Sequence, residues 1–212
     1  MTLNPKSNAV RRSKTEPRLR GTDLVLPSLR DPAYLDNRRR VELVAEEAAK
    51  LPPQAGRMLD VGGKGKPYAC SFAGRAVNRH FLDVEPALSV DVAGDARIMP
   101  FSDASMDVVL ATQVLEHIPD PIAAIGEIRR VLKPGGTLLL SVPSIFPQHG
   151  SPGDYWRYMW STCICKCSPV RGRGWKDWSS GRFCPVNNLI GLLRKTYRGN
   201  QSATNYFVVA VR

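Results

Sequence analysis

An acidic residue followed by three glycines is the first group in the sequence whose types and spacing suit a binding site. Asp60 ends a short apolar run. Three glycines follow it, at Gly62, Gly63 and Gly65. Glycine has no Cβ, so the backbone can turn sharply and a ligand can lie against it. The pattern predicts a strand, a glycine-rich loop and a helix whose unpaired N–H groups bind an anion, as in the nucleotide crevice of an open α/β sheet. A tight turn without a ligand has the same signature.

A second acidic residue stands about 20 residues beyond the glycine loop, the spacing of a ribose-binding acid in such folds. This residue is Asp83, at the end of the next apolar run. A carboxylate can accept hydrogen bonds from both hydroxyls of a ribose, which is the role we expect for Asp83. An Asp that caps a loop is the alternative. Glu85 takes the ribose role if the strand register differs by two, since alternate residues of a strand share a face.

Four ordered blocks carry a resemblance to a known family. They read FLDVE (81–85), VDVAGDARIMPF (90–101), MDVVLATQVLEHIPDP (106–121) and VLKPGGTLLLSVP (131–143). With the glycine loop they resemble the class I S-adenosylmethionine-dependent methyltransferases, in particular the type 11 group. The resemblance covers roughly residues 56–158. It implies S-adenosyl-L-methionine as the cofactor and leaves the methyl acceptor open.

The resemblance also implies where the cofactor lies. Asp60 is expected near the amino group of its methionine part, and the loop N–H groups near its carboxylate. Asp95 is expected to accept a hydrogen bond from the adenine amino group, while the N–H of Ala96 contacts a ring nitrogen; Asp91 is a lower-ranked alternative. The predicted cofactor-binding residues are Asp60, Gly62, Gly63, Gly65, Asp83, Val84, Asp95, Ala96, Thr112 and Gln113.

The sequence departs from the family pattern at one position of the glycine loop. Lys64 stands where the second glycine of D-x-G-x-G is expected, so we predict an altered turn. Farther along, Thr112 and Gln113 end the predicted fourth strand and are expected to touch the methionine part. Asp107 begins that strand and has a structural role in the family.

The candidates for catalysis lie in two loops. A methyl group leaves a sulfonium without protonation of the leaving group, so positioning supplies much of the rate, with effective molarities of about 10⁵ M or more. A base is needed only for a hydroxyl or protonated amine acceptor. The stretch 144–159 resembles the H-x-x-P-x-D-Y-W-R-[FY] segment of some of these enzymes. The alternative is a rigid structural corner in which Asp154 and Arg157 pair. The candidates are His117, His149, Asp154, Tyr155 and Arg157.

After Tyr158 the resemblance breaks until about Asn187. Residues 159–183 contain cysteines at alternate positions and an RGRGWKDW stretch, without helical periodicity. A zinc site is disfavoured because C-x-C-x-C is not the usual ligand spacing, and we predict no metal. An RNA-contacting loop is a second interpretation. We favour a diverged or altered segment, a change that can impair activity while cofactor binding persists.

The chain carries a net charge of +11, distributed as +4 over residues 1–32, −1 over 33–152 and +8 over 153–212. Basic ends attract nucleic acid, anionic lipid or nucleotide sugars, but a solvated surface is the favoured interpretation. Apolar residues make up 43% of the chain, as in ordinary globular proteins. We find no run of about 18 apolar residues and no secretory signal, and five cysteines suit reduced thiols, so we predict a cytoplasmic protein without a membrane span.

The elements that must position these residues alternate between strand and helix. Residues 1–31 are expected to form a flexible basic arm, and residues 32–212 one methyltransferase domain with an acceptor lid at 144–186. We predict helices at 33–51, 68–73, 121–132 and 187–197, and strands at 57–61, 77–82, 88–92, 105–111, 137–143 and 205–212. KPGG (133–136) is expected to form a turn, and the Arg38–Arg40 triplet a solvated face. The predicted fold is a Rossmann-like doubly wound α/β sheet, mostly parallel with an antiparallel last strand, in three α/β/α layers.

The predicted function is transfer of a methyl group from S-adenosylmethionine to a small-molecule or glycan-type acceptor. A non-catalytic cofactor-binding protein with a disrupted lid is one rival, and an RNA methyltransferase is another. The N-P-P-[YF] motif of amino-methylating enzymes does not follow the fourth strand, which disfavours base methylation. An NAD-dependent dehydrogenase is disfavoured by the LEHI and GDA blocks and by the lack of a Tyr-x-x-x-Lys pair.

Overall fold

A computed structural model describes residues 34–53, 56–76, 78–144, 153–158, 164–166, 198–201 and 205–212. Its elements are α2 (Tyr34–Lys50), β1 (Arg57–Val61), β2 (Asn78–Asp83), β3 (Val92–Ala93), β4 (Met106–Thr112), the 3₁₀ turn η1 (Leu115–His117), α3 (Pro121–Val131), β5 (Leu132–Pro143), β6 (Trp156–Tyr158), β7 (Ile164–Lys166), β8 (Arg198–Gln201) and β9 (Asn205–Val211). The predicted arm at 1–31 and helix at 187–197 lie outside the described residues.

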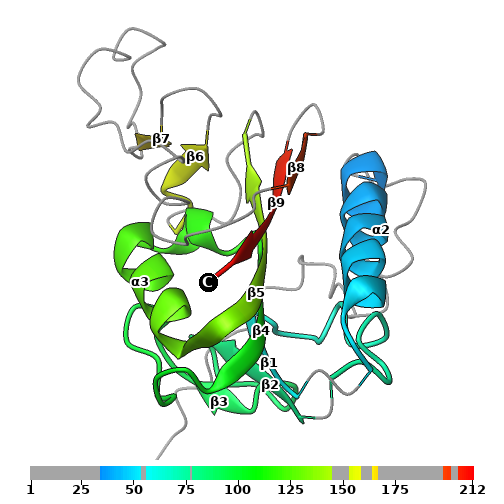
Figure 1. The fold of residues 1–212 in the computed structure, drawn as a ribbon. Coiled ribbons are helices and arrows are strands. Elements are labelled where there is room, and N and C mark those ends of the chain that lie inside the picture. The colour runs from blue at the N-terminus through cyan, green and yellow to red at the C-terminus, as the bar shows by residue number, and fades with distance from the viewer. Residues whose placement is uncertain are drawn as a thin grey trace, which may run out of the picture.

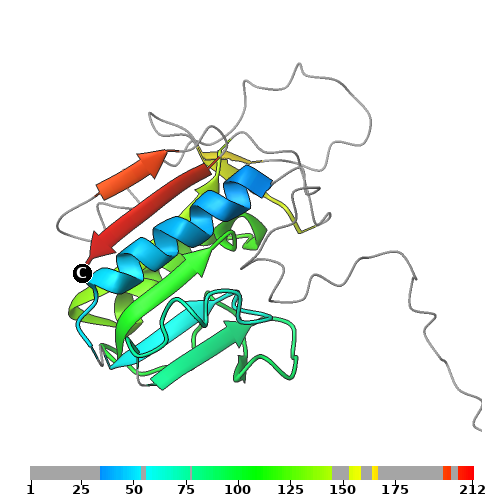
Figure 2. The same ribbon diagram turned by 90° about the vertical axis from the view of Figure 1, so that its right-hand side faces the viewer.

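A seven-stranded sheet forms the centre of the molecule, in the order β3-β2-β1-β4-β5-β9-β8. Strands β1 to β5 are parallel, and β9 runs antiparallel to β5. Figure 1 shows α2 and α3 on opposite faces of the sheet. From the side, α2 lies along the sheet, where it packs against β5 and β9 (Figure 2). The predicted three-layer fold with an antiparallel last strand is confirmed.

The strand order reverses between β1 and β4, which places the carboxyl ends of both strands at the centre of one edge. Loops at this edge of an open parallel sheet form the usual ligand crevice. The register fixes which residues reach it: Val61 lies beside Ala111 and Leu82, and Asp83 lies beside Ala93. The fold therefore brings the ends of β1, β2, β3 and β4 to one place.

The apolar core lies on both faces of the sheet because β4 is covered on each side. Val109 and Ala111 face the cluster that includes α3, whereas Val108 and Leu110 face the cluster that includes α2. All four are at most 1% exposed, which explains the continuous apolar run in the sequence. The core holds the carboxyl end of β4 in a fixed position.

Local signals fix the bounds of α3. The Asp120 carboxylate accepts hydrogen bonds from the N–H groups of Ile122 and Ala123, each at 3.1 Å, and Pro121 occupies the first turn. The predicted helix at 121–132 is thereby confirmed to within one residue. The helix predicted at 33–51 is likewise observed as Tyr34–Lys50.

The helix predicted at 68–73 is wrong. The segment forms consecutive turns, in which the N–H of Ala69 donates to the carbonyl of Lys66 (3.1 Å) and that of Ser71 to Tyr68 (3.0 Å). Lys66, just before the segment, has a φ of 54°, which lies outside the helical region. Tyr68 is 3% exposed and Phe72 is fully buried, so the turns cover β1 without a helix.

Two further predictions need correction. The third strand, predicted at 88–92, is only Val92–Ala93. Leu88 lies in the short connection after β2 and is fully exposed. The KPGG turn lies inside β5: Met106 pairs with Leu132 and Val108 with Thr137, so residues 133–136 bulge opposite Asp107. Lys133 Nζ lies 2.8 and 2.9 Å from the two carboxylate oxygens of Asp107, so an ion pair spans this bulge.

Candidate functional site

The glycine loop lies tightly against its own strand and against the chain after β4. Gly62 has a φ of 77°, and a Cβ on it would lie 2.7 Å from Val114 Cγ2. A Cβ on Gly63 would lie 2.8 Å from Asp60 Cγ. Glycine is therefore required at both positions, by conformation at the first and by close approach at the second.

Asp60 is a buried acid with an unsatisfied oxygen. Its side chain is 2% exposed, and Oδ2 has no hydrogen-bond partner in the described part of the chain. Burial raises the pKa of Asp60 to about 8, and the negative charge of Asp83 adds to the shift. A buried carboxyl group of this kind is an incomplete interaction that a cationic ligand group would satisfy.

Asp83 and Asp95 come together at the end of β2 and β3. The carbonyl of Asp83 accepts a hydrogen bond from the N–H of Gly94 (2.9 Å), the residue before Asp95. The Asp83 carboxylate accepts from the N–H of Glu85 (3.0 Å), and the neighbouring Val84 is 75% exposed. Asp95 therefore follows directly after the residue that is hydrogen-bonded to the end of β2.

The Asp95 carboxylate is already engaged. It accepts from the N–H of Arg97 (2.8 Å) and from the Arg97 guanidinium, with the shortest contact at 2.6 Å. These hydrogen bonds lower the pKa of Asp95, so it is ionised at neutral pH. Ala96 is 9% exposed. A ligand amino group at Asp95 would share the carboxylate with Arg97 or displace it.

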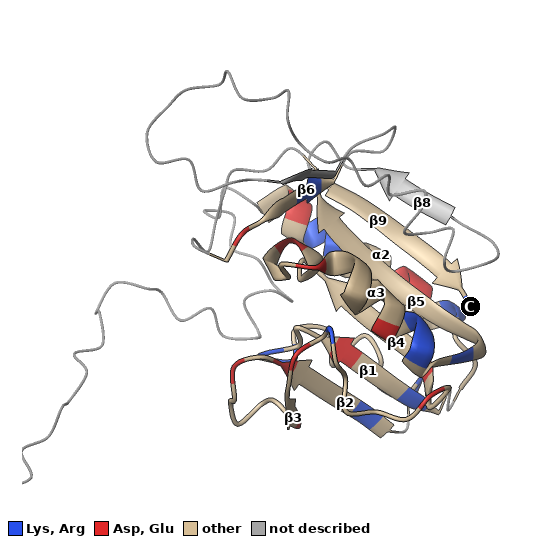
Figure 3. Ribbon diagram, turned by 90° about the vertical axis from the view of Figure 1, so that its left-hand side faces the viewer, with Lys and Arg blue, Asp and Glu red and all other residues tan. Residues whose placement is uncertain are grey.

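Two contacts tie the glycine loop to the chain that follows β2. Lys64, which replaces the expected glycine, forms an ion pair with Glu85, and both side chains are largely exposed. The N–H of Gly65 donates to Ser89 Oγ (3.0 Å). Figure 3 shows acidic and basic residues interspersed in the loops at the carboxyl ends of β1, β2 and β3. Glu85 is therefore paired with Lys64, and the altered loop carries a cross-link that the glycine would lack.

The carboxyl end of β4 is strained at one residue. Gln113 has a φ of 50°, which is uncommon for a residue with a Cβ. Its backbone N–H donates to the carbonyl of Ser141 (2.9 Å) and its side-chain Nε2 to Ser141 Oγ (3.2 Å). Thr112 precedes it and is partly exposed at the same edge. The two hydrogen bonds to β5 hold Gln113 in this conformation.

Glu116 and His117 form a turn above this edge. Glu116 is fully buried, and neither carboxylate oxygen has a hydrogen-bond partner in the described residues. Burial raises its pKa to about 8, against the opposing influence of Arg157 and Arg40. His117 Nδ1 lies 2.7 Å from the carbonyl of Gly153, so Nδ1 carries the proton, and Nε2 lies 3.9 Å from Glu116 Oε1.

The segment 153–158 forms a rigid corner. Arg157 contacts both oxygens of Asp154, at 2.5 and 2.6 Å, and the two side chains are almost completely buried. Trp156 Nε1 donates to the carbonyl of Ile118 (2.8 Å), and the backbone N–H of Tyr155 donates to the carbonyl of Glu116 (2.7 Å). Asp154 and Arg157 therefore support the Glu116 turn, as in the structural alternative. His149 and most of the cysteine segment lie outside the described residues.

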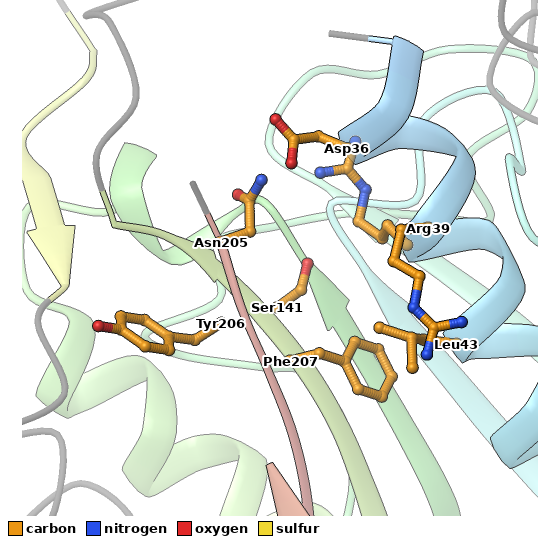
Figure 4. A pocket seen from close by; sticks show the side chains of 8 residues that line it. Asp36, Arg39, Leu43, Ser141, Asn205, Tyr206 and Phe207 are labelled. Atoms are coloured by element: carbon orange, nitrogen blue, oxygen red, sulfur yellow. The ribbon is translucent and has the colours of Figure 1, made fainter. Parts of the chain in front are cut away.

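A pocket beside α2 was missed at the sequence level. Arg39 and Arg40, expected on a solvated face, line it together with Ser141 and Asn205 (Figure 4). The signal lay in the helical period, since Arg40 precedes the buried Leu43 and Val44 by three and four residues and shares their face. Arg38, on another face, has a side chain that is 60% exposed.

The described residues fit a nucleoside-type cofactor with a charged amino acid part. The unsatisfied, buried Asp60 oxygen suits an ammonium group, and the glycines leave the loop backbone open to a ligand. Asp83 ends the adjacent strand, and its carboxylate can accept hydrogen bonds from both hydroxyls of a ribose. The residues therefore match the donor and acceptor groups of S-adenosylmethionine.

Sequence comparisons point to one family. A family model described as a methyltransferase domain matches residues 59–140. The ubiquinone biosynthesis O-methyltransferase of Xanthomonas axonopodis pv. citri (strain 306) is 34% identical over 214 residues, covering 85% of each chain. An uncharacterized methyltransferase of Mycobacterium sp. (strain JLS) is 35% identical over 108 residues, which are 45% of this chain and 42% of that relative. The chain thus spans less than half the length of the mycobacterial protein.

Solved structures share the fold. 1,6-Didemethyltoxoflavin-N1-methyltransferase of Burkholderia thailandensis, with bound 1,6-didemethyltoxoflavin and S-adenosylhomocysteine, has a TM-score of 0.53 at 15% identity and covers 85% of this chain and 84% of its own. A SAM dependent methyltransferase from Aquifex aeolicus has a TM-score of 0.50 at 15% identity, with 85% and 93% covered. None of the helices in the described part of this chain has the length and apolar character needed to cross a bilayer. The chain belongs to the class I S-adenosylmethionine-dependent methyltransferases, and S-adenosyl-L-methionine is its cofactor.

Proposed function

We propose that the chain transfers a methyl group from S-adenosylmethionine to a hydroxyl oxygen of a small molecule. The observation that carries the proposal is the buried Asp60 carboxyl, whose Oδ2 is unsatisfied beside the glycine loop and close enough to Asp83 for the two charges to interact. In this proposal Asp60 holds the cofactor's ammonium group, and Asp83 accepts from its ribose hydroxyls. Val84, Asp95 and Ala96 contact the adenine, and Thr112 and Gln113 contact the methionine part.

Protonation of Asp60 changes when the ligand binds. Its raised pKa means that the carboxyl is largely neutral in the free protein near pH 7. An ammonium group next to it favours the ionised form and lowers that pKa. Asp60 therefore releases a proton on binding, so cofactor affinity should rise as the pH approaches 8.

The cofactor supplies an electrophilic methyl group on a positively charged sulfur, which departs as a neutral thioether. The chain's contribution is to hold the acceptor in line with that methyl group and to exclude water. An attacking hydroxyl must also lose its proton. We assign that step to His117, whose ring is oriented at the end of β4 by the contact of Nδ1 with the carbonyl of Gly153.

The acceptor class rests on the relatives. The Xanthomonas protein is named as an O-methyltransferase of ubiquinone biosynthesis, and the Burkholderia structure contains a small heterocycle. A hydroxyl-bearing small molecule is also consistent with the lack of an N-P-P-[YF] motif after β4. The RNA alternative draws only on the basic ends of the chain, and those lie mostly outside the described residues.

The test separates binding from turnover. S-adenosylhomocysteine should raise the melting temperature of the chain whereas NAD should not, with about 2.7 kcal/mol of stabilisation at a hundred times the Kd. Labelled S-adenosylmethionine should then transfer its methyl group to catechol-type probes. Cofactor binding without transfer to any acceptor would favour the non-catalytic alternative, and transfer to RNA that falls steeply with salt would favour the nucleic-acid one.

A further inference from the structure

A small pocket lies between the first half of α2 and the strands β5 and β9, at the end of the sheet where β5 finishes. Its cavity volume is about 20 Å³, so only a small group such as a carboxylate can enter it. Its walls combine charged groups from the helix with polar and aromatic groups from the strands (Figure 4). The lining residues are Asp36, Arg39, Arg40, Leu43, Ser141, Asn205, Tyr206 and Phe207.

Three of the lining residues have hydrogen-bond donors left over. Arg39 uses only Nη1, which contacts Glu46 at 3.1 Å and Glu42 at 3.4 Å. Nε and Nη2 of Arg39 make no hydrogen bond to the described part of the chain. An arginine edge of this kind can bind a carboxylate through two parallel hydrogen bonds.

Arg40 and Ser141 add donors from opposite walls. Arg40 engages Tyr68 through Nε (3.1 Å) and Asn37 through Nη2, which leaves Nη1 without a hydrogen bond to the described residues. Ser141 is 2% exposed, and its Oγ accepts from Gln113 Nε2 at 3.2 Å. A hydroxyl is also a donor, and its proton has no acceptor in the described part of the chain.

The pocket is joined to the proposed cofactor cleft on two sides. Gln113, at the end of β4, is hydrogen-bonded to Ser141 in the pocket wall. Arg40 is hydrogen-bonded to Tyr68, which follows the glycine loop. The positive charge of Arg40 also acts on Glu116 in the turn above the cleft. Hydrogen bonds therefore link the pocket wall to residues on two sides of the proposed cofactor cleft.

We propose that this pocket binds an acidic group of the methyl acceptor, with the Nε and Nη2 edge of Arg39 as the anchor and Ser141 and Arg40 as additional donors. The acceptor is then a hydroxylated carboxylic acid whose hydroxyl reaches the cleft. The guanidinium N–H groups of Arg39 and Arg40 that make no hydrogen bond to the described residues are donors, so an anionic acceptor group is favoured over a neutral one. This inference rests on the proposed function, because it assigns the acceptor of that same reaction.

The test compares an acid with a neutral molecule of the same shape. 3,4-Dihydroxybenzoate and 3,4-dihydroxybenzamide are titrated calorimetrically into the full chain saturated with S-adenosylhomocysteine. Saturation fills the site for the cofactor's own carboxylate, so the acid cannot bind there. We expect the benzoate to bind at least about tenfold more tightly than the benzamide, which corresponds to about 1.4 kcal/mol.

The variants assign that preference to the pocket. Arg39→Gln should abolish it, and Ser141→Ala should weaken it several-fold. Arg38→Gln is the matched control, because Arg38 contacts the same Glu42 but does not line the pocket, and it should retain the preference. Melting temperatures confirm that each variant is folded.

The failures are distinguishable. If S-adenosylhomocysteine itself does not bind, the proposed function fails. If it binds but the two probes bind equally, or neither binds, the pocket proposal is wrong while the methyltransferase assignment stands. A preference that survives in Arg39→Gln also overturns the proposal.

Discussion

Gly63 packs directly against the carboxyl group of Asp60, so closely that a Cβ at position 63 would lie 2.8 Å from Asp60 Cγ. The contact encloses an acid whose Oδ2 has no hydrogen bond to the described residues, at the point where β1 enters the glycine loop. Burial there raises the pKa of Asp60 to about 8, so the loop stores an unfavourable interaction that a bound cation would relieve. Binding groups placed this way lower the stability of the free protein.

Asp60→Asn should therefore separate stability from binding. The raised pKa means that the folded state retains a proton that the unfolded chain has released, so wild-type stability falls as the pH rises from about 4 to about 8. Asn does not titrate, and urea unfolding should show the variant gaining on the order of 1–3 kcal/mol relative to wild type between pH 5 and pH 8. Affinity for S-adenosylhomocysteine should fall tenfold or more, by about 1.4 kcal/mol. An unchanged affinity would remove Asp60 from the ammonium role.

Asp83→Ala should abolish most of the thermal stabilisation by S-adenosylhomocysteine, because a ribose would lose its paired acceptor. Asp91→Ala is the control. Asp91 Oδ2 accepts from the N–H of Phe81 (3.1 Å), so its loss should lower the melting temperature of the free protein without reducing the ligand-induced shift. The two variants are compared by thermal denaturation with and without ligand. Equal shifts in both would contradict the assignment to Asp83.

Glu116→Gln should change the pH dependence of stability. The pKa of Glu116 is raised to about 8 by burial, so the wild-type protein loses stability between about pH 4.5 and pH 8, and the variant should lose less. Glu127→Gln is a control of opposite sign, because hydrogen bonds from Arg130 lower the pKa of Glu127. That variant should be destabilised at pH 7 and approach wild type as the pH falls through the range where Glu127 protonates. Parallel pH profiles for wild type and Glu116→Gln would show that folding does not raise the pKa of Glu116.

Gly62→Ala and Gly126→Ala should have opposite effects. Gly62 has a positive φ, and a Cβ would lie 2.7 Å from Val114 Cγ2, so alanine there should cost more than about 1 kcal/mol. Gly126 lies in α3, where a Cβ would meet nothing within 4 Å, so alanine should stabilise by about 0.5–1 kcal/mol. Chemical denaturation of the two variants gives both values. A stable Gly62→Ala protein would mean that the loop can move away from Val114.

Arg157→Met should destabilise the protein by about 3–5 kcal/mol, because the Asp154 carboxylate would stay buried without its guanidinium. The double variant Asp154→Leu with Arg157→Met should recover part of that loss, since it buries no charge at this position. Unfolding free energies of the single and double variants form the required cycle. Additive losses would show that the pair is not coupled.

Local patterns were sufficient for β4 and for α3. The continuous apolar run of β4 and the Asp120–Pro121 cap act within a few residues, so the sequence predicted both. The helix predicted at 68–73 is wrong because the N–H groups of Ala69, Ser71 and Ala73 donate to the carbonyl three residues earlier, after Lys66 enters the segment with a positive φ. The strand predicted at 88–92 is wrong because the connection after β2 is too short to bring all of residues 88–92 into register beside β2.

The order of Asp60, the glycines, Asp83 and Asp95 along the chain, each following an apolar run, determined the sheet, the family and the cofactor edge, because parallel strands always bring their carboxyl ends together. The tertiary structure alone decided which charges are engaged there. Asp95 pairs with Arg97, Asp154 pairs with Arg157, Glu116 is buried beneath that corner, and Arg39 lines a pocket with Ser141. These outcomes depend on side-chain packing, largely between segments far apart in the sequence, and no local periodicity encodes the desolvation that sets the protonation of Asp60 and Glu116.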